Sequence, residues 1–307
     1  MIIDIQATVD LAFRMMLGSP KHAAVTIHFL NSILRSGPRI QQVTILDPTL
    51  EKETVEDKLS ILDIKAQDET GRLFNIEMQT SLTASLHQRL IYYAARLHGS
   101  QLPEGAPYSQ LCPTICICVL SQSFFAQYPL MHLELQLRDP LGLVSLDELQ
   151  LHFIQLPKST TDVHNVQIAC SLERWSFLFQ RAHEIDADEL RRLLPEPEFH
   201  EALGVLEMIS QTPATRELYE ARLKAKRDEE SRLYDARMNG LTQGRAEGRV
   251  EGRVEGKWIG KIQVLEGLLG LPPTDPTLLE SWDAAQLAAR SKELEQLLAA
   301  AEKWRKV

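Results

Sequence analysis

Apolar and polar residues alternate along two neighbouring segments of the chain, 59–67 (LSILDIKAQ) and 72–79 (RLFNIEMQ). A period of two is typical of β-strands that are buried on one face. The short segment between them, 68–71 (DETG), favours a turn. The pattern therefore predicts a β-hairpin in the first third of the chain.

Apolar residues at helical spacing predict helices on both sides of this hairpin. The first helix runs from Thr8 to about Leu17, and a second starts at Ser19-Pro20, where Pro suits the first turn, and ends near Arg35. A third covers roughly residues 84–101. Further strands are expected at 39–46, 113–121, 131–139 and 149–157, with a polar loop at 47–58 and a hairpin between the last two strands. The all-apolar segment 113–121 indicates burial on both faces, and the order of elements predicts an α/β or α+β sheet domain.

The chain is expected to be helical from about residue 168 onward. The stretch 216–237 mixes both charge signs, which is typical of a solvated helix face, and a final segment of Leu-rich helices is interrupted at Leu271-Pro272-Pro273. We therefore predict a sheet domain over 1–200, a charged helical connector over 201–239, a glycine-repeat helix over 240–261 and a helical segment over 262–307.

Glycine recurs every four residues between Gly240 and Gly260. Six glycines inside a helix cost about 6 kcal/mol relative to alanine, so a flexible linker is one interpretation. The residues between them favour a helix, however, and small residues at one spacing let two helices approach closely. We favour the second interpretation, which predicts that this helix pairs with its counterpart in a homodimer.

The composition narrows the class of protein. Apolar residues make up 44% of 307 residues and the formal net charge is −9, which argues against a strongly basic nucleic-acid binder without excluding local basic patches. We interpret Cys116 and Cys118 as buried thiols of a reduced protein, because no CxxC or HxxxH spacing supports a zinc site. No signal peptide and no membrane-spanning apolar stretch is found, so we expect a cytoplasmic protein without membrane contact.

The predicted hairpin brings two carboxylates together. If the apolar faces of its strands lie on one side, Asp63 is either opposite or diagonal to Glu77, with Lys65 and Gln79 beside them on the other face. Facing acids repel, and a divalent cation such as Mg²⁺ between them would relieve the repulsion and could activate a water molecule. Two solvated acids on an exposed sheet face are the simpler alternative, at a cost of a few tenths of a kcal/mol.

The segment LDIKAQDETGRLFNIEMQ resembles the signature of the recombination-promoting nuclease (Rpn) family, also described as PD-(D/E)XK nuclease family transposases. DLAFRMMLG, the HQRLIYYAARLHG helix, LHFIQLPK and ERWSFLF are similar to other parts of that family, so the resemblance covers about residues 8–260. It implies a restriction-endonuclease-like PD-(D/E)XK core, of α/β (α+β) class, with a helical C-terminal extension.

The resemblance implies roles for particular residues. Asp63 and Glu77 would bind the metal, and Asp10 would add a metal contact, although an acid favoured by the helix dipole explains Asp10 equally well. Gln79 stands where the superfamily has Lys, and Lys65 on the same face is a candidate to replace that missing cation. Gln88 and Tyr92 resemble a Gln-x-x-x-Tyr motif of related nucleases, which implies DNA contacts by these two, and Arg89 lies between them as a candidate phosphate contact. An ordinary helix surface is the alternative for all three.

These observations predict a Mg²⁺-dependent DNA endonuclease of low sequence specificity, linked to recombination or transposition. Specificity is expected to be low because we find no recognition helix and no basic arm. The alternative is a catalytically degenerate relative that binds DNA or oligomerises, which the Gln79 departure and the acidic charge favour.

Overall fold

The computed structural model describes residues 2–34, 37–50 and 60–304. The chain divides into two compact units, Met1–Glu230 and Ser231–Val307. One helix, α7 (Pro213–Leu269), begins in the first unit and continues in the second. Within the described residues, no helix combines the length and the apolar character that crossing a membrane requires.

A six-stranded mixed sheet forms the centre of the first unit, in the order β1-β4-β5-β6-β8-β7. The strands are β1 (Val43–Leu46), β4 (Ile64–Asp68), β5 (Leu73–Gln79), β6 (Thr114–Leu120), β7 (His132–Arg138) and β8 (Ser145–Gln155). β5, β6 and β8 run parallel, and the other pairs are antiparallel. Both predicted hairpins and the predicted α/β class are confirmed, and β6 is buried at every position, as its apolar sequence indicates.

Two strand predictions need correction. The strand predicted at 39–46 begins only at Val43, because the backbone N–H groups of Ile40, Gln41 and Gln42 donate to the side chains of Asn31 and Glu69 and are not available to a sheet. The predicted loop at 47–58 contains a short strand, β2 (Thr49–Leu50), which pairs with β3 (Ser60–Ile61). Residues 51–59 lie outside the described residues.

The single strand predicted at 59–67 is also wrong, because the chain bends at Asp63 between β3 and β4. Leu62 donates its backbone N–H to the carbonyl of Pro48, next to β2, and takes no part in the β4–β5 ladder. Its side chain packs with Leu73 and Leu97, whereas the side chain of Ile64 belongs to the main core on the other face of the sheet. The expected common face of Leu62 and Ile64 therefore does not form.

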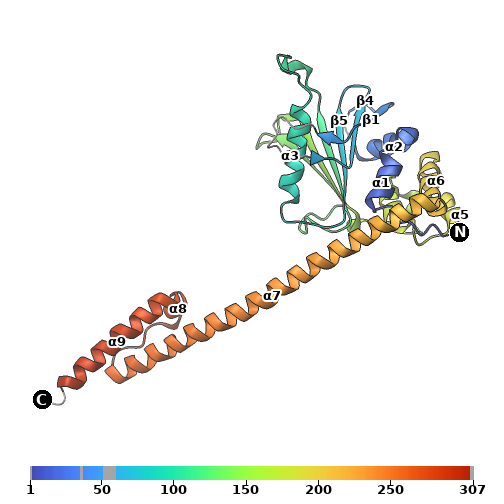
Figure 1. The fold of residues 1–307 in the computed structure, drawn as a ribbon. Helices are drawn as coiled ribbons and strands as arrows, with labels where there is room; N and C mark the ends of the chain where they lie inside the picture. Colours follow the sequence, from blue (N-terminus) through green and yellow to red (C-terminus); the bar gives the residue numbers. More distant parts are fainter. Residues whose placement is uncertain (1, 35–36, 51–59, 305–307) are drawn as a thin grey trace. The chain divides into compact units, whose positions relative to one another are not determined.

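Helices cover both faces of the sheet (Figure 1). Those of the first unit are α1 (Asp10–Leu17), α2 (Ala23–Ile33), α3 (Leu86–Gly99), α4 (Ser171–Arg181), α5 (Ala187–Leu193) and α6 (Pro197–Gln211). Single 3-10 turns occur at Pro20–His22, Tyr108–Gln110, Leu156–Lys158 and Val166–Ile168. α3 lies on one face of the sheet, and α1, α2, α4 and α6 lie on the other.

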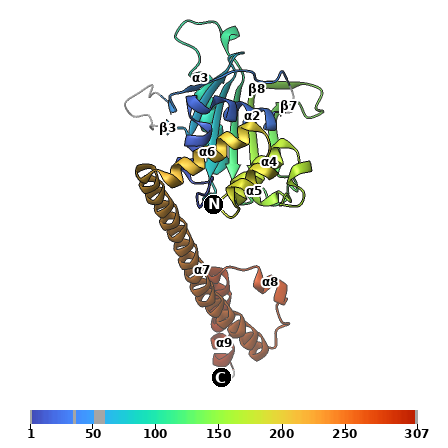
Figure 2. The same ribbon diagram turned by 90° about the vertical axis from the view of Figure 1, so that its right-hand side faces the viewer.

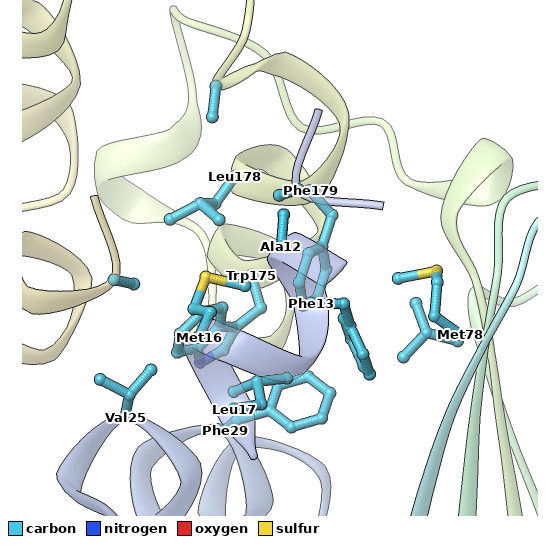
Figure 3. Close-up of a cluster of buried hydrophobic side chains, with 14 of the residues drawn as sticks. Ala12, Phe13, Met16, Leu17, Val25, Phe29, Met78, Trp175, Leu178 and Phe179 are labelled. Carbon is cyan, nitrogen blue, oxygen red and sulfur yellow. The ribbon is translucent and has the colours of Figure 1, made fainter. Parts of the chain in front are cut away.

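The main core lies between the sheet and α1, α2, α4 and α6. Figure 3 shows Phe13 and Met16 of α1 among side chains from α2 and α4, with Met78 of β5 on the sheet side. The Phe29 ring meets the Trp175 ring edge to face, with their centroids 5.5 Å apart. Each fully buried side chain of this size stabilises the fold by about 1.5–3 kcal/mol, so this face anchors the first unit.

The opposite face of β5 is also covered. Leu86 and Leu90 of α3 pack on Cys118 and Phe153, forming a second apolar cluster. The simpler alternative, two solvated acids on an exposed sheet face, therefore does not hold at Glu77, whose exposed fraction is 4%. The alternation pattern alone assigns Asn75 and Glu77 to the polar face of β5, but α3 covers this face and shields both residues from water.

The start of α7 packs on the first unit. Tyr219 and Leu223 are buried in the main core, and the Tyr219 hydroxyl accepts a hydrogen bond of 2.8 Å from the Gln6 backbone N–H. The remaining positions of this stretch are mainly exposed, in agreement with the expected solvated helix face.

The second unit contains the rest of α7, α8 (Pro276–Glu280) and α9 (Ala284–Trp304). Residues 240–260 are helical throughout, and none of the six glycines has another heavy atom of the described residues within 4 Å of the place where a Cβ would lie. α7 ends just before Gly270 (φ +67°), as the Leu271-Pro272-Pro273 sequence predicts. Ile262, Leu265, Leu279, Leu287 and Leu294 form the core of this unit.

Candidate active site

The strands β4 and β5 pair in the first of the two registers that the sequence allows. Ile64 lies opposite Ile76, and this ladder ends there. Asp63 is the next residue outward, on the side of Glu77. Its Oδ2 accepts a hydrogen bond of 2.9 Å from the Met78 backbone N–H. The Asp63 side chain therefore binds a β5 backbone N–H just beyond the end of the β4–β5 ladder.

Glu77 is a buried carboxylate with an incomplete set of partners. Its Oε2 accepts a hydrogen bond of 3.1 Å from Gln79 Nε2, whereas no described group reaches its buried Oε1 with good hydrogen-bond geometry. Burial, and then the charge of Asp63, raise the pKa of Glu77 to about 7. The Asn75 side chain and the Asp63 backbone are close enough to the carboxylate to oppose the rise of the Glu77 pKa in part. The folded protein therefore holds this group at the edge of ionisation near neutral pH.

Gln79 connects Glu77 to a cation on α3. Its Oε1 accepts a hydrogen bond of 2.6 Å from Arg89 Nη2, while its amide nitrogen donates to Glu77. Arg89 Nε is buried and has no partner within the described part of the chain. The cation of this site thus comes from the helix above the strand, and the amide of Gln79 lies between it and the carboxylate.

Charges on both sides of the sheet act on Asp63. Burial raises the pKa of Asp63; the hydrogen bond from Met78 and then the charge of Arg14 oppose this rise, and the charge of Asp10 adds to it. Arg14 and Asp10 belong to α1, on the face opposite α3. Asp63 therefore lies where the two faces meet, at the end of the ladder.

Asp10 is the first residue of α1, and its Oδ2 lies 3.6 Å from Arg222 Nη1. Its charge reaches Asp63, but residues 2–34, 37–50 and 60–304 contain no group of three or more His, Cys, Asp or Glu side chains placed to hold a metal ion. The protein itself thus brings two carboxylates together at the ladder end, Asp63 and Glu77.

Lys65 is half-buried on β4, where it pairs with Asn75 and not with Glu77. It lines a pocket together with Asp63 and Arg14. It therefore lies beside the pair of acids, on the side of Asp63.

The three predicted residues of α3 have different environments. Gln88 and Tyr92 are exposed, and the Tyr92 hydroxyl accepts a hydrogen bond of 3.3 Å from Arg96. Arg89 turns inward to Gln79. Tyr93, one turn beyond Arg89, is near enough to the acids that the charges of Arg89, Glu77 and Asp63 all act on its pKa, which burial raises. Tyr93 was not predicted as a site residue; its i, i+4 spacing from Arg89 is the sequence signal that could have indicated it.

Beneath α3, the face of β5 and β6 carries further groups. Asn75 pairs with Cys116 and Glu77 with Cys118, and both thiols are free and buried, as predicted. Both amide atoms of the buried Asn75 have no hydrogen-bond partner among the described residues. Asn75 was missed, although the alternation pattern already placed it on the face of Glu77.

A helix-flanked mixed sheet with an aspartate at a ladder end and a Glu-x-Gln on the next strand defines the core of a PD-(D/E)XK nuclease. The family model described as PD-(D/E)XK nuclease family transposase matches residues 7–236, and the chain belongs to this family. No curated protein and no solved structure matched the chain in the parallel comparisons.

Membership of this family gives the chain a nuclease- or transposase-related function. PD-(D/E)XK nucleases generally use divalent metal ions, and the family implies DNA as the substrate. The match ends at residue 236, so it includes the start of α7 but not the glycine repeat.

Proposed function

We propose that this protein is a metal-dependent DNA endonuclease of low sequence specificity, linked to recombination or transposition. The observation that carries the proposal is the buried Glu77 Oε1, which has no partner in the described residues and belongs to a carboxyl whose pKa the charge of Asp63 helps to raise. A structural carboxylate would be expected to have its oxygens bonded, because an unsatisfied buried acceptor costs about 1–3 kcal/mol.

A divalent cation fits this arrangement. Asp63 and Glu77 are hard oxygen donors, and Mg²⁺ is typically held by one or two carboxylates together with water and substrate phosphate. When bound, such a cation polarises a phosphoryl oxygen and lowers the pKa of a coordinated water. Asp10 remains a candidate for a further contact at this site.

The remaining residues would position the substrate. Gln79 holds one oxygen of Glu77 and so fixes the direction of the other. Arg89 holds Gln79 in turn, and its Nε is a donor that a phosphate oxygen could use. Lys65 could supply the cation that Gln79 lacks, and the exposed Gln88 and Tyr92 could contact DNA beside it.

One observation favours a second candidate, a catalytically degenerate DNA-binding or oligomerising protein. Both ends of the Gln79 amide are already bonded within the chain, to Glu77 and Arg89. The amide is therefore held in place by the protein, and it carries no charge, so it lacks the cation with which a lysine at this position would act on an attacking water.

Cleavage of a supercoiled plasmid with Mg²⁺ and with EDTA tests the proposal. We expect nicked and linear products with Mg²⁺ only, and a loss of at least about 1000-fold in Asp63→Ala and Glu77→Ala, equivalent to roughly 4 kcal/mol of transition-state stabilisation. Glu148→Ala, which changes an exposed acid on β8, is the matched control and should cleave normally. Full activity of either site variant would refute the assignment, and no cleavage by the unaltered protein would favour the degenerate alternative.

A further inference from the structure

Three neighbouring pockets of the first unit form one groove beside the ladder end. The first is lined by Asp63, Lys65 and Arg14, and the second shares Arg14 and Gly18 with it. The third shares Asp10 and Arg222 with the second and adds Met78, Thr80 and Lys226. The groove passes along α1 between the end of the sheet and the first turns of α7, and we call it the α1 groove.

Basic residues predominate along the α1 groove. Lys65, Arg14, Arg222 and Lys226 line it, against the two acids Asp63 and Asp10. This balance is opposite to that of the whole chain, which has a net charge of −9. Clustered Lys and Arg on an acidic protein are the electrostatic signature of a phosphate-binding surface.

The two basic residues on α7 are held against the first unit. Arg222 Nη1 lies 3.6 Å from Asp10 Oδ2, a separation that leaves most of its donors available. Lys226 is one turn further along, roughly 6 Å along the helix axis. It is half-buried, and the burial lowers the pKa of Lys226 more than the charge of Glu230 raises it. Folding thus partly removes the Lys226 ammonium from water, and an anionic ligand would offset the lost hydration of this charge.

We propose that the α1 groove binds the sugar–phosphate backbone of a DNA strand and leads it to Asp63. Lys65 and Arg14 contact phosphates next to the pair of acids, and Arg222 and Lys226 contact phosphates further along the same strand. The choice of DNA as the ligand rests on the proposed nuclease function, but binding by the groove can be measured without any cleavage.

The test is the affinity of the full chain for a fluorescein-labelled DNA duplex, measured by fluorescence anisotropy in EDTA at several salt concentrations. We expect Arg222→Ala with Lys226→Ala to weaken binding at least about tenfold and to reduce the slope of log K against log salt by about 2, since each phosphate contact contributes about 0.9. The matched control is Lys224→Ala with Arg227→Ala, which removes the same charge from exposed positions of the same helix outside the groove. The control should keep its slope.

Equal losses in the two double variants would mean that only net charge matters and would overturn the groove. Absence of DNA binding by the unaltered protein, or an unchanged affinity of the groove variant, would also overturn it. The proposed function can fail separately: a protein that binds DNA through Arg222 and Lys226 but never cleaves plasmid keeps the groove and loses the nuclease. Conversely, a protein that cleaves while the groove variant binds normally keeps the nuclease and loses the groove.

An independent observation concerns the edge of the sheet formed by β7. In the described part of the chain β7 pairs with β8 and with no other strand, and Figure 2 shows these two strands at one side of the sheet. Its apolar face continues outward from the cluster under α3, and the exposed leucines include Leu137 at 54% and Leu143, near the hairpin tip, at 80%. Open edges with exposed apolar residues favour pairing with another strand.

The sequence of β7 is complementary to itself. The register between β7 and β8 shifts between Gln136 and Leu137, but Gln136 and Leu137 are consecutive on β7, so the extra residues belong to β8. In an antiparallel pair of two β7 strands centred on Gln136, Glu134 of one copy lies opposite Arg138 of the other, and Leu135 lies opposite Leu137. Within one chain, Gln136 already bonds both Glu134 and Arg138, so the three polar side chains form an ordered row. Opposite charges and apolar pairs at facing positions stabilise a strand pair by about 0.2–1 kcal/mol each.

We infer that two copies of this chain associate through β7 about a two-fold axis at Gln136. A charge swap followed by light scattering tests this. Arg138→Glu places like charges opposite each other and, in a Gly248→Leu, Gly252→Leu background that removes any pairing by the glycine repeat, should halve the molar mass; Glu134→Arg combined with Arg138→Glu in the same background should restore it. A monomeric wild type, an unchanged mass in Arg138→Glu, or a double variant that stays dissociated while its circular dichroism is native would each refute this interface.

Discussion

Among the described residues, each unit of the protein buries one glutamate, and the two have different partners. Glu77 of the first unit has an exposed fraction of 4% and one hydrogen bond, from Gln79. Glu266 of the second unit is 1% exposed, and its two oxygens accept from the backbone N–H and the hydroxyl of Thr274, with Arg290 at 3.8 Å. The second carboxylate is satisfied by the fold itself, and the first is left with a free oxygen beside another acid.

Asp68 shows that incomplete bonding is not general to the sheet. One residue beyond β4's last pairing with β5, it accepts from the N–H and hydroxyl of Thr70 and from the backbone and side chain of Arg72. The buried acids named here thus differ in bonding: Asp68 and Glu266 have partners for both oxygens, and Glu77 has a partner for one. All three carboxylates are buried, so what distinguishes Glu77 is the number of hydrogen-bond partners that the fold provides.

The largest expected effect on stability is at Glu266. We expect Glu266→Ala to lower the free energy of unfolding of the second unit by about 3 kcal/mol, because it empties a buried position and removes both hydrogen bonds to the half-buried Thr274. Glu77→Ala should cost about 1 kcal/mol or less, because the lost packing is offset by removal of an unpaired carboxylate. Hydrogen exchange of each unit measures both, with the exposed Glu293→Ala as control. Equal costs at the two sites would remove the distinction between them.

The next effect is a pH dependence at Glu77. Its pKa in the fold, about 7, lies above its ordinary value, so the fold prefers the protonated form. This contribution is complete below about pH 4.5 and is lost as the pH rises through 7, for a change of up to about 3 kcal/mol. Urea unfolding at pH 5 and pH 8 should therefore show a larger loss for the wild type than for Glu77→Gln. Parallel curves for the two proteins would contradict the raised pKa.

The same protonation should affect activity in the opposite sense. A divalent cation binds the ionised carboxylates, so Mg²⁺-dependent cleavage should rise with pH through about 7. Cleavage that is independent of pH between 5.5 and about 8.5 would argue against Glu77 as a ligand.

Gln79 provides a smaller effect, because it acts on Glu77 without replacing it. We expect Gln79→Ala to slow cleavage by roughly 10–100-fold, the usual cost of losing a residue that orients a metal ligand, with metal affinity measured by calorimetry in parallel. Gln79→Lys should retain activity, since an ammonium there can still reach Glu77. Unchanged rates in Gln79→Ala would make this residue a bystander.

The smallest effect per residue concerns the glycine repeat. Because no described atom lies near the missing Cβ positions, Gly248→Ala and Gly252→Ala should each stabilise an unpaired helix by about 1 kcal/mol. If the repeat pairs two copies in a homodimer, as its sequence predicts, Gly248→Leu with Gly252→Leu should instead shift the protein toward monomer in light scattering. A stabilised helix with unchanged molar mass would exclude this pairing.

The sequence predicted the elements well where one period dominates. Alternation located β4 and β5, and the even register brought Asp63 to the side of Glu77. It failed at Asp63 itself, since a bend depends on the competing bond between Leu62 and Pro48, which no local pattern encodes. Burial of Glu77 was missed for a related reason, because period two distinguishes two faces but does not say which helix covers the second.

The sequence brought Asp63 and Glu77 together and named Lys65 and Arg89 beside them, but it gave no sign of Arg14, Arg222 and Lys226. Arg89 stays a candidate DNA contact, and its guanidinium also bonds Gln79, which no local pattern indicated. Arg222 and Lys226 themselves lie more than 140 residues beyond the end of β5 at Gln79, and their approach to Asp10 and Thr80 depends on tertiary packing alone.

The four free thiols differ in exposure, and their reactivity can therefore be used to measure opening of α3. Cys170 is exposed and Cys112 half-buried, so both should react quickly with a maleimide. Burial raises the pKa of Cys116 to about 12 and that of Cys118 well above its ordinary value, and Cys118 lies beneath Leu86 and Leu90. Alkylation of these two requires the helix to open first, so their labelling rate reports the opening equilibrium above the two acids without any added probe.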